Sequence, residues 1–464
     1  MLGLVLSATL VARSQVFGDQ LNLLARGWLL AARGELVPYG NPLSTGGNEP
    51  GALTSLLVGL PLELWRDHRA PTVVIWLFHL AAWLLLDRVV RGTLGWRERV
   101  LFAVVYWLNP WRLHFSGFLW NPNYLFVLGA LHLWTAWRQA ERPRFWASLL
   151  QALAIGLAFQ IHAAFVLLAA ASALLWWRGW QKLHWGGVVA GAALAAASLA
   201  PWIAEALRHP AILSAHAGFP GRGLVMLFPL LRGLLYWLRY GSLSLSDQLL
   251  RFDFTTAFGA AADRWLATPL LALAQIAGGL TLLVSLAANW ELLRSRGRAW
   301  LTTRGPGASG REWIAGYAAI SLGAAFVVYC LAPTTIMFWQ GVPLFHAATI
   351  PPVLWLARQL DGPRAAWVRR GVAATALFSV LIGLAMAFGS PTFRCGGRRD
   401  EHFPLRSNSP MFTDLGIQQT CPWPLDVPGE WWPDVLPEEG RKSDGHSTSP
   451  APGTPGRPIG GRLR

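Results

Sequence analysis

An apolar segment is followed by the stretch FGDQLNLLARGWLLAARGELVPYGNPLSTGGNEPGALTSLLVGLPL, Phe17 to Leu62. This stretch contains two segments with a helical pattern, separated by a polar loop. From Gln20 to Arg33, apolar side chains share one face opposite polar and basic ones, which predicts a helix lying in the headgroup plane of a membrane. Pro38 to Pro50 is polar and turn-rich, and Gly51 to Trp65 predicts a second interfacial piece. Asp19 opens the first piece, so the sequence places an acid at a membrane face.

The composition around this stretch is that of a polytopic membrane protein. Of the 464 residues, 53% are hydrophobic and only 14% are charged, whereas a soluble domain carries roughly a quarter charged residues. Several apolar runs approach the ~20 residues that a helix needs to cross a ~30 Å hydrocarbon layer. We therefore expect an all-α bundle of about eleven transmembrane helices, with interfacial helices in the outer loops.

The basic residues fit a membrane topology better than nucleic-acid binding. The net charge is +15, but Lys and Arg recur in short clusters between apolar runs and form no single stripe with interleaved aromatics. Under the positive-inside rule, these clusters mark cytoplasmic loops. They lie at Arg88 to Arg99, Arg138 to Arg144, Arg178 to Lys182, Arg294 to Arg311 and Arg358 to Arg370. The prediction is a bacterial inner-membrane protein with a cytoplasmic N-terminus, an extracytoplasmic C-terminus and no nucleic-acid partner.

The predicted bundle occupies residues 1–390, with outer loops at residues 17–71 and 205–267. Within it, Trp146 to Trp177 is too long for one straight span, and basic loops flank it on both sides. An even number of passes is then required, which predicts a tight hairpin that turns at Gln160 to His162. A single long tilted helix is the alternative.

The tail beyond the bundle divides into two parts. Residues 391–440 are expected to form a small extracytoplasmic segment in which Cys395 and Cys421 are candidates for a disulfide. Residues 441–464 are rich in Gly, Pro and Ser, which predicts disorder.

The loop from Phe17 to Leu62 resembles the first outer loop of multi-span glycosyltransferases that use polyprenyl-phosphate sugars. From Asp19 to Gln359 the chain is similar to membrane glycosyltransferases of the GT-C fold, close to the protein O-mannosyltransferase and lipid A aminoarabinose transferase group, glycosyltransferase family 39. The resemblance implies a helical bundle with a lipid-accessible pocket. It further implies transfer of a hexosyl or pentosyl group from a polyprenyl-phosphate donor to a lipid, glycan or protein acceptor.

Asp19 is the main catalytic candidate, because the resemblance implies that the acid of this loop is the general base. Removal of the acceptor proton lets the oxygen attack the anomeric carbon while the polyprenyl phosphate leaves from the opposite face. The configuration of the sugar should therefore invert. The structural alternative is that Asp19 only caps the interfacial helix, since Asp is a favoured N-cap residue.

Three further candidates lie in loops of the predicted outer face. Glu49 precedes Pro50 and is a candidate to hold an acceptor or a cation, although a single carboxylate in a loop is more often a surface residue. Asn123 belongs to the turn Asn121-Pro122-Asn123, where related transferases often carry an acid and this chain has none, so a purely structural turn is favoured. Arg112, just upstream, is a candidate to face the donor phosphate.

Other candidates could line a pocket or stabilise the leaving phosphate, on which charge develops in the transition state. His162 lies in Gln160-Ile161-His162, which matches the QxH pattern of some bacterial members of the resembled family, and His346 corresponds to that family's pocket lining. Both are also readily explained as packing or capping residues. Arg222, in the long outer loop, is the remaining cationic candidate and could instead anchor that loop to lipid headgroups.

No resident cofactor is indicated, although a divalent cation is compatible with the loop acids. The sequence has no HExxH, no CxxC and no P-loop, so a soluble nucleotide sugar is disfavoured as the donor. The expected partners are the polyprenyl-phosphate sugar, the acceptor and membrane lipids.

Two other functions remain open. A surface-polysaccharide polymerase or ligase would place its key groups in the later loop at residues 205–267, so that Arg222 rather than Asp19 would be indispensable. A lipid-linked sugar transporter or flippase would carry charges at mid-membrane and related halves. The polar groups here cluster at the predicted outer ends, which favours surface chemistry.

Overall fold

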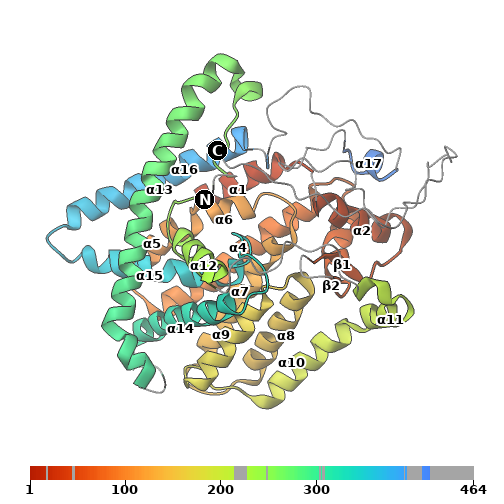
Figure 1. The fold of residues 1–464 in the computed structure, drawn as a ribbon, viewed down its shortest axis with the longest axis horizontal. Coiled ribbons are helices and arrows are strands. Elements are labelled where there is room, and N and C mark those ends of the chain that lie inside the picture. The colour runs from red at the N-terminus through yellow and green to blue at the C-terminus, as the bar shows by residue number, and fades with distance from the viewer. Residues whose placement is uncertain are drawn as a thin grey trace.

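The computed structural model describes residues 1–16, 19–43, 47–213, 227–246, 249–302, 305, 309–390, 392–393 and 410–417. Most of its helices form one bundle, and several of the remaining elements, including the two strands, gather at one end of it (Figure 1). The bundle helices are α1 (Leu2–Ala12), α4 (Ala70–Thr93), α5 (Trp96–Phe102), α7 (Leu125–Arg138), α8 (Phe145–Ile161), α9 (Phe165–Trp177), α10 (Trp185–Ser198), α13 (Thr255–Thr302), α14 (Gly310–Cys330), α15 (Phe345–Gln359) and α16 (Ala365–Gly389). The remaining elements are α2 (Asp19–Arg33), β1 (Tyr39–Pro42), β2 (Asn48–Pro50), α3 (Leu53–Leu64), α6 (Pro110–Phe115), α11 (Ala200–Arg208), α12 (Leu227–Tyr240) and α17 (Pro410–Asp414).

Several helices have the length and apolar character of membrane spans. Among the described residues, α4, α14, α16 and Ala257–Ser295 of α13 meet this test, and α10 with α11 meets it as a pair bent by 44°. Shorter apolar helices, α1, α3, α8 and α9, accompany them. This confirms the prediction of an all-helical polytopic protein. The number of about eleven spans stays a prediction, because length and composition alone do not fix it.

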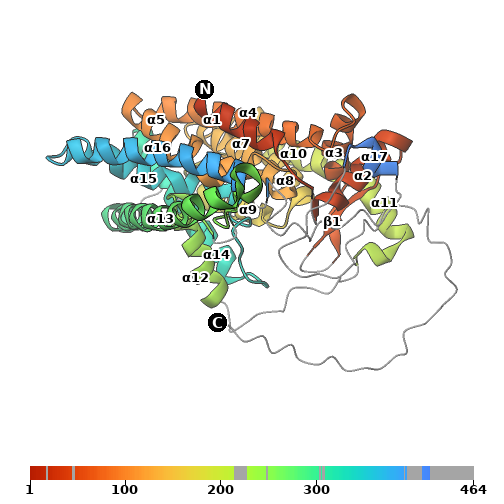
Figure 2. The same cartoon turned by 90° about the horizontal axis from the view of Figure 1, so that it is seen from above.

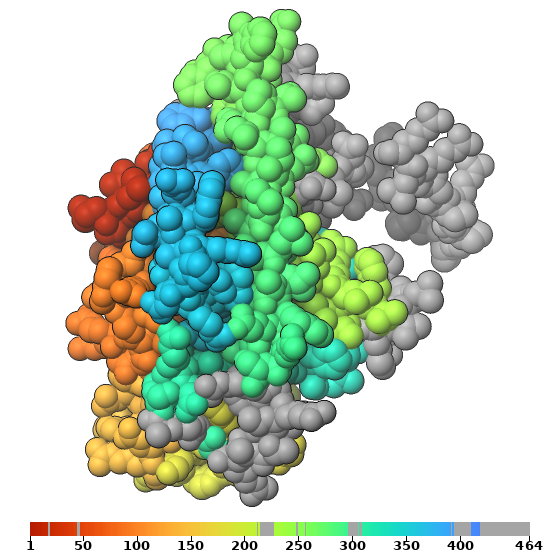
Figure 3. Space-filling view, turned by 90° about the vertical axis from the view of Figure 1, so that its left-hand side faces the viewer, coloured from red at the N-terminus to blue at the C-terminus, as the bar shows by residue number. Residues whose placement is uncertain are grey.

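Helix α13 forms the outside of one face of the bundle. In Figure 3 it runs as a green ridge beside α16, which is drawn in blue. Only 17% of its most apolar window is buried, and large side chains such as Leu283 and Trp290 are exposed at 62% and 66%. Exposed apolar surface of this extent is what a lipid-facing helix requires.

The run from Trp146 to Trp177 forms the predicted hairpin. Helix α8 ends at Ile161, α9 begins at Phe165, and the two helices pack against each other. The break lies where His162 has extended backbone angles and the Nδ1 atom of its ring accepts a hydrogen bond from the Ala164 N–H at 3.0 Å. This local bond stabilises the turn that the sequence predicts at Gln160 to His162.

The first outer loop contains the two predicted interfacial helices, α2 and α3, which pack along each other. Their closest approach is at Gly27, where a Cβ would lie 2.8 Å from Cβ of Val58 and 2.9 Å from the backbone nitrogen of Gly59. Such a contact is possible only for glycine, because any side chain would force the two helices apart. The position of α2 is therefore fixed by the helix beside it.

A short antiparallel pair, β1 and β2, joins α2 to α3, with Tyr39 opposite Pro50 and Pro42 opposite Asn48. The sequence predicts only a polar, turn-rich loop here. The strands escape prediction because Gly, Pro and Asn, which dominate them, are poor strand formers. A side-chain hydrogen bond stabilises the strand pair despite this low strand propensity, since Asn48 Nδ2 donates to the Gly40 carbonyl at 3.1 Å.

Helix α17 lies beside α2 in both views (Figures 1 and 2), although nearly the whole chain separates them in sequence. We call residues 410–417 the docking segment. Its apolar side chains Met411, Phe412, Leu415 and Ile417 are buried in the same core as the bundle.

Candidate active site

Asp19 is the first residue of α2, at the end of the bundle that the loop charges predict to be the outer one. Its Oδ2 accepts a hydrogen bond from Trp120 Nε1 at 3.2 Å, and its backbone carbonyl accepts one from Asn41 Nδ2 at 3.4 Å. Burial raises the pKa of the Asp19 carboxyl, while the Trp120 bond and the charge of Arg26 oppose that rise. A carboxylate with a raised pKa is a better proton acceptor than a solvated one.

Glu49, on β2, is a second carboxyl in the same place and is only 2% exposed. One of its oxygens accepts from the Asn41 backbone N–H at 3.3 Å, and the other accepts from Nδ2 of Asn121. Burial raises the pKa of Glu49 well above its ordinary value, and the negative charge of Asp19 raises it further. The expectation that a lone loop carboxylate is a surface residue is therefore wrong for Glu49.

The bond to Asn121 changes the interpretation of the Asn-Pro-Asn turn. That turn contains no acid of its own, which argued against a second carboxylate there, but the hairpin of the first outer loop brings Glu49 to it. Asn121 also donates to the Ile161 carbonyl at the end of α8, at 2.9 Å. Gly51, with φ of +90°, packs directly against the side chain of Gln160. The strands β1 and β2, the Asn-Pro-Asn turn and the end of α8 thus come together around Glu49.

Arg26 supplies a positive charge beside the two acids. It is fully buried, and its Nη1 donates to the Asn22 carbonyl at 3.1 Å and to Oδ1 of Asn41 at 3.2 Å. Its charge opposes the rise in the pKa of both Asp19 and Glu49. The amphipathic pattern from Gln20 to Arg33 places Arg26 only on the polar face of an interfacial helix. The usable signal was its spacing of seven residues from Asp19, which places both on one helical face.

Aromatic side chains extend from Asp19 on the other side. The Trp120 ring, whose N–H bonds Asp19, has its centroid 5.0 Å from Trp339 and 6.3 Å from Phe338. Phe338 in turn contacts Tyr236 of α12 at 6.3 Å. Flat apolar rings next to a carboxylate suit a sugar or isoprenoid surface better than a strongly hydrated ligand. Sequence analysis did not single out these rings.

The side chains of Arg112 and Asn123 bond to residues other than the two acids. The Arg112 guanidinium is fully buried, donates to Oγ of Ser7 on α1 at 3.0 Å and lies 4.0 Å from the Trp107 ring centroid. Asn123 closes its own loop by donating to the Phe118 carbonyl at 2.7 Å. Neither side chain shares a hydrogen bond with Asp19 or Glu49 among those found for the described residues.

The two histidine candidates have structural contacts. His162 bonds its own turn, as described above, and His346 is buried with Nε2 3.1 Å from the Tyr317 hydroxyl. That hydroxyl is also 2.9 Å from Nδ1 of His132, so His346 belongs to a buried polar chain between α7, α14 and α15. Three further candidates, Arg222, Cys395 and Cys421, lie outside the described residues.

A metal site of three protein ligands is not formed within the part of the chain that the structure describes, where no three His, Cys, Asp or Glu side chains group together. Asp19 and Glu49 remain a pair of carboxyls. Such a pair is compatible with a divalent cation held with the help of substrate oxygens.

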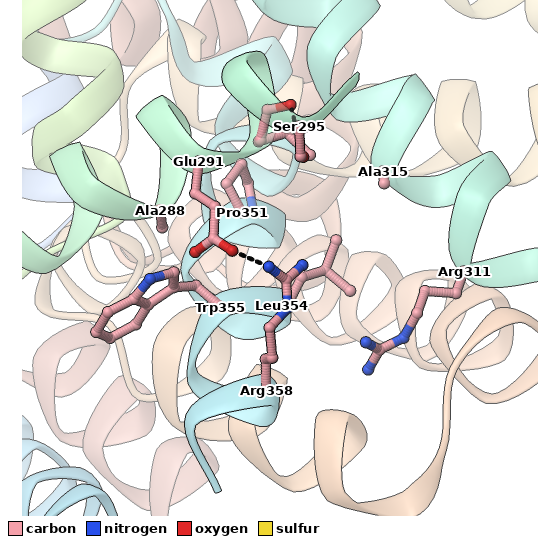
Figure 4. Close-up of a pocket in the computed structure, with 10 residues that line it drawn as sticks. Ala288, Glu291, Ser295, Arg311, Ala315, Pro351, Leu354, Trp355 and Arg358 are labelled. Carbon is pink, nitrogen blue, oxygen red and sulfur yellow. Dashed lines mark hydrogen bonds and ion pairs between the residues drawn. The ribbon is translucent and has the colours of Figure 1, made fainter. Parts of the chain in front are cut away.

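A cavity at the opposite end of the bundle has a different character (Figure 4). It measures about 60 Å³ and is lined by residues of α13, α14 and α15, among them Glu291, Arg311 and Arg358. Arg358 forms an ion pair with Glu291, and Arg311 forms one with Glu98 of α5. Because these charges are used to join helices in a predicted cytoplasmic region, the cavity is not a second candidate for the active site.

Comparison with known proteins identifies the architecture. No family model matches the chain, and no curated protein matches its sequence. The crystal structure of ArnT from Cupriavidus metallidurans in the apo state matches with a TM-score of 0.52 and 14% identity, over 83% of this chain and 75% of ArnT. The chain has the ArnT fold. The structure of the same ArnT bound to undecaprenyl phosphate matches with a TM-score of 0.51 and 15% identity, over 84% and 76% of the two chains.

The ArnT fold is that of a GT-C glycosyltransferase, so it confirms the predicted fold class. At 14% to 15% identity the similarity extends to the fold and carries no residue roles. The acid pair, Arg26 and the aromatic rings are therefore interpreted from this chain's own geometry.

Proposed function

We propose that this protein is a membrane glycosyltransferase that moves a sugar from a polyprenyl-phosphate donor to an acceptor at the extracytoplasmic face of a bacterial inner membrane. The ArnT fold supports this, since one ArnT structure holds undecaprenyl phosphate. The observation that carries the proposal is the pairing of Asp19 and Glu49, two carboxyls with raised pKa values, where the outer loop meets the Asn121 turn. Perturbed acids grouped at one place are typical of catalytic sites.

In the proposed reaction, Asp19 takes the proton of the acceptor hydroxyl. The acceptor oxygen then forms a bond to the anomeric carbon, and the bond from that carbon to the phosphate oxygen breaks. The electron pair leaves with the polyprenyl phosphate, and the configuration inverts because attack and departure occur on opposite faces. Glu49, which keeps its proton longer, is proposed to orient the acceptor through a hydrogen bond.

The leaving phosphate requires a positive neighbour. Arg26 is the cation that lies beside both acids, and it joins the four candidates from the sequence, Arg112, His162, Arg222 and His346. Trp120 and Trp339 are proposed to border the sugar or the first isoprene units.

The test measures transfer of labelled sugar from a panel of polyprenyl-monophosphate sugars by membranes that contain wild type, Asp19→Asn or Asp67→Asn. Asp67 is a matched control, since it lies in the same outer loop and its carboxylate forms a partly buried ion pair with Arg69. We expect Asp19→Asn to lose on the order of 10²–10⁴-fold in rate, the usual effect of a general base. Asp67→Asn should stay close to wild type.

Other outcomes would redirect the proposal. Full activity of Asp19→Asn would exclude it as the base, and wild type that consumes no monophosphate donor would contradict the transferase. Loss of activity in Arg222→Gln with Asp19→Asn unaffected would favour a polymerase or ligase. A chelator added in parallel tests whether a divalent cation takes part, because a cation held by one carboxyl pair and substrate should be readily removed.

A further inference from the structure

The C-terminal docking segment makes specific polar contacts with the helix that carries Asp19. Oδ2 of Asp414 accepts a hydrogen bond from Trp28 Nε1 on α2 at 2.7 Å. The same oxygen is 3.4 Å from Nη1 of Arg66, whose Nη2 donates to the Ala31 carbonyl near the end of α2 at 2.5 Å. One carboxylate therefore contacts the C-terminal half of α2 both directly and through Arg66.

The docking segment also contacts the connection between α3 and α4. The backbone N–H of His68 donates to the Leu415 carbonyl at 3.2 Å. Nε2 of the His68 ring lies 3.4 Å from the Ser14 carbonyl, just beyond α1. The segment thus contacts the α3–α4 connection directly, and His68 links that connection to the chain just before α2.

Apolar burial anchors these polar contacts. Met411 and Leu415 are completely buried, and Phe412 and Ile417 are exposed at 2% and 5%. Four buried apolar side chains in eight residues form a packed contact, whereas a tail lying loosely on the surface would leave them exposed. The side chain of Asp414 is 38% exposed. Its bond to Trp28 therefore lies at the edge of the contact, beside the buried apolar side chains.

The N-terminal end of α2 is held by contacts within the candidate active site. Asp19 bonds Trp120 and Asn41 at the N-terminal end of the helix, and Arg26 bonds Asn41 two turns later. Trp28 lies nine residues beyond Asp19, which is about 13 Å along a helix that rises 1.5 Å per residue. A helix fixed at both ends has little freedom to rotate or slide.

We propose that Asp414 and Trp28 are positioning residues: the docking segment fixes α2 so that Asp19 and Arg26 stay in register with Glu49. This inference rests on the proposed function for its effect on rate, but its effect on α2 is independent of any activity. Neither side chain touches the substrate in this assignment. Small displacements of a catalytic group lower turnover, because the reacting atoms no longer meet in a productive geometry.

The experiment compares Asp414→Ala, Asp414→Asn and Trp28→Phe in the full-length protein in nanodiscs. Asp361→Ala is the matched control, since Asp361 forms an exposed ion pair with Arg97 at the other predicted face. Hydrogen–deuterium exchange of the α2 peptide and the separate values of kcat and KM are measured for each.

We expect Asp414→Ala and Trp28→Phe each to lower kcat by about tenfold with little change in KM, as misplacement of a catalytic group does. Both should raise amide exchange in α2, and the double variant should be no worse than either single variant. Asp414→Asn should retain activity, because its amide oxygen still accepts the Trp28 N–H. Asp361→Ala should match wild type in both measurements.

Unchanged α2 exchange in Asp414→Ala overturns the positioning role, whatever the activity. Equal loss in Asp414→Asn and Asp414→Ala overturns the assignment to the Trp28 bond. Wild type that transfers no sugar contradicts the proposed function alone, because the exchange measurement still tests the docking segment.

Discussion

Asp19 and Glu49 differ in the order in which they ionise. Burial raises the pKa of Asp19, and it raises the pKa of Glu49 well above its ordinary value. We therefore expect Asp19 to lose its proton first as pH increases, so that one acid can act as a base beside a protonated neighbour. Two acids whose surroundings separate their pKa values are suited to different roles in one reaction.

The hydrogen bond from Trp120 allows the role of Asp19 as a base to be tested through the pH dependence of activity. It stabilises the charged form of Asp19, so Trp120→Phe removes a contribution that lowers the Asp19 pKa. Because the base must be deprotonated to act, wild-type activity should rise with pH on its acid limb, and the limb of Trp120→Phe should lie at higher pH. The measurement is a pH profile of kcat/KM for both proteins.

Trp96→Phe serves as the control, since Trp96 is 74% exposed at the start of α5, in a region predicted to be cytoplasmic. Its acid limb should coincide with that of wild type. A limb in Trp120→Phe that moves to lower pH, or does not move, would contradict the role of this bond.

Candidate site residues were only partly predictable from the sequence. Asp19 was found because its loop is local and its chemistry is evident from the residue type. Its partnership with Glu49 was not, because the link runs through Asn121, 72 positions from Glu49 along the chain. Arg112 was expected in an outer loop, but it is buried against Ser7 of α1, 105 positions away. Contacts of this range depend on packing, which helical periodicity does not report.

Among the helices and strands, prediction succeeded where one pattern persists. The interfacial helix expected from Gln20 to Arg33 is α2, Asp19–Arg33, because its amphipathic period extends over four turns. Prediction was less successful for α13, which begins at Thr255, within the outer loop expected at residues 205–267. The first turns of α13 carry mixed charges and Gly259 with φ of +81°, features that resemble a loop.

The packing of α2 against α3 yields a prediction about stability. Gly27→Ala places a methyl group 2.8 Å from Cβ of Val58, so the two helices must separate. We expect a loss of about 1–3 kcal/mol in the free energy of unfolding, the usual cost of overpacking a core. Thermal unfolding in detergent should show a lowered midpoint.

The control for this prediction is Gly323→Ala on α14, where a Cβ would have no neighbour within 4 Å. Alanine is the better helix former, so this variant should be neutral or slightly more stable. If Gly27→Ala behaves like Gly323→Ala, the close approach of α2 to α3 is not a constraint.

For the complete protein, the basic clusters predict which end of the bundle faces the cytoplasm. Glu35 lies exposed just after α2, and Asp361 lies exposed just after α15. In a variant whose native cysteines are replaced by serine, we expect Glu35→Cys to react with a membrane-impermeant maleimide in intact spheroplasts. Asp361→Cys should react only after permeabilisation, because the positive-inside rule places its loop in the cytoplasm.

The parent without any cysteine provides the background for this labelling. The reverse pattern would place Asp19 at the cytoplasmic face, where a transferase would draw on a different pool of acceptors. Labelling of both positions without permeabilisation would indicate damaged spheroplasts and calls for an independent protease-protection measurement of the same two sites.

The bond between Trp28 and Asp414 joins residues 386 positions apart. A ribosome adding roughly 5–20 residues per second releases the second partner on the order of 20–80 s after the first. Throughout that interval the nascent chain already carries its acids but lacks the contact that fixes their helix. Under the proposed function, we expect a protein cut short before residue 410 to insert into the membrane yet transfer sugar slowly.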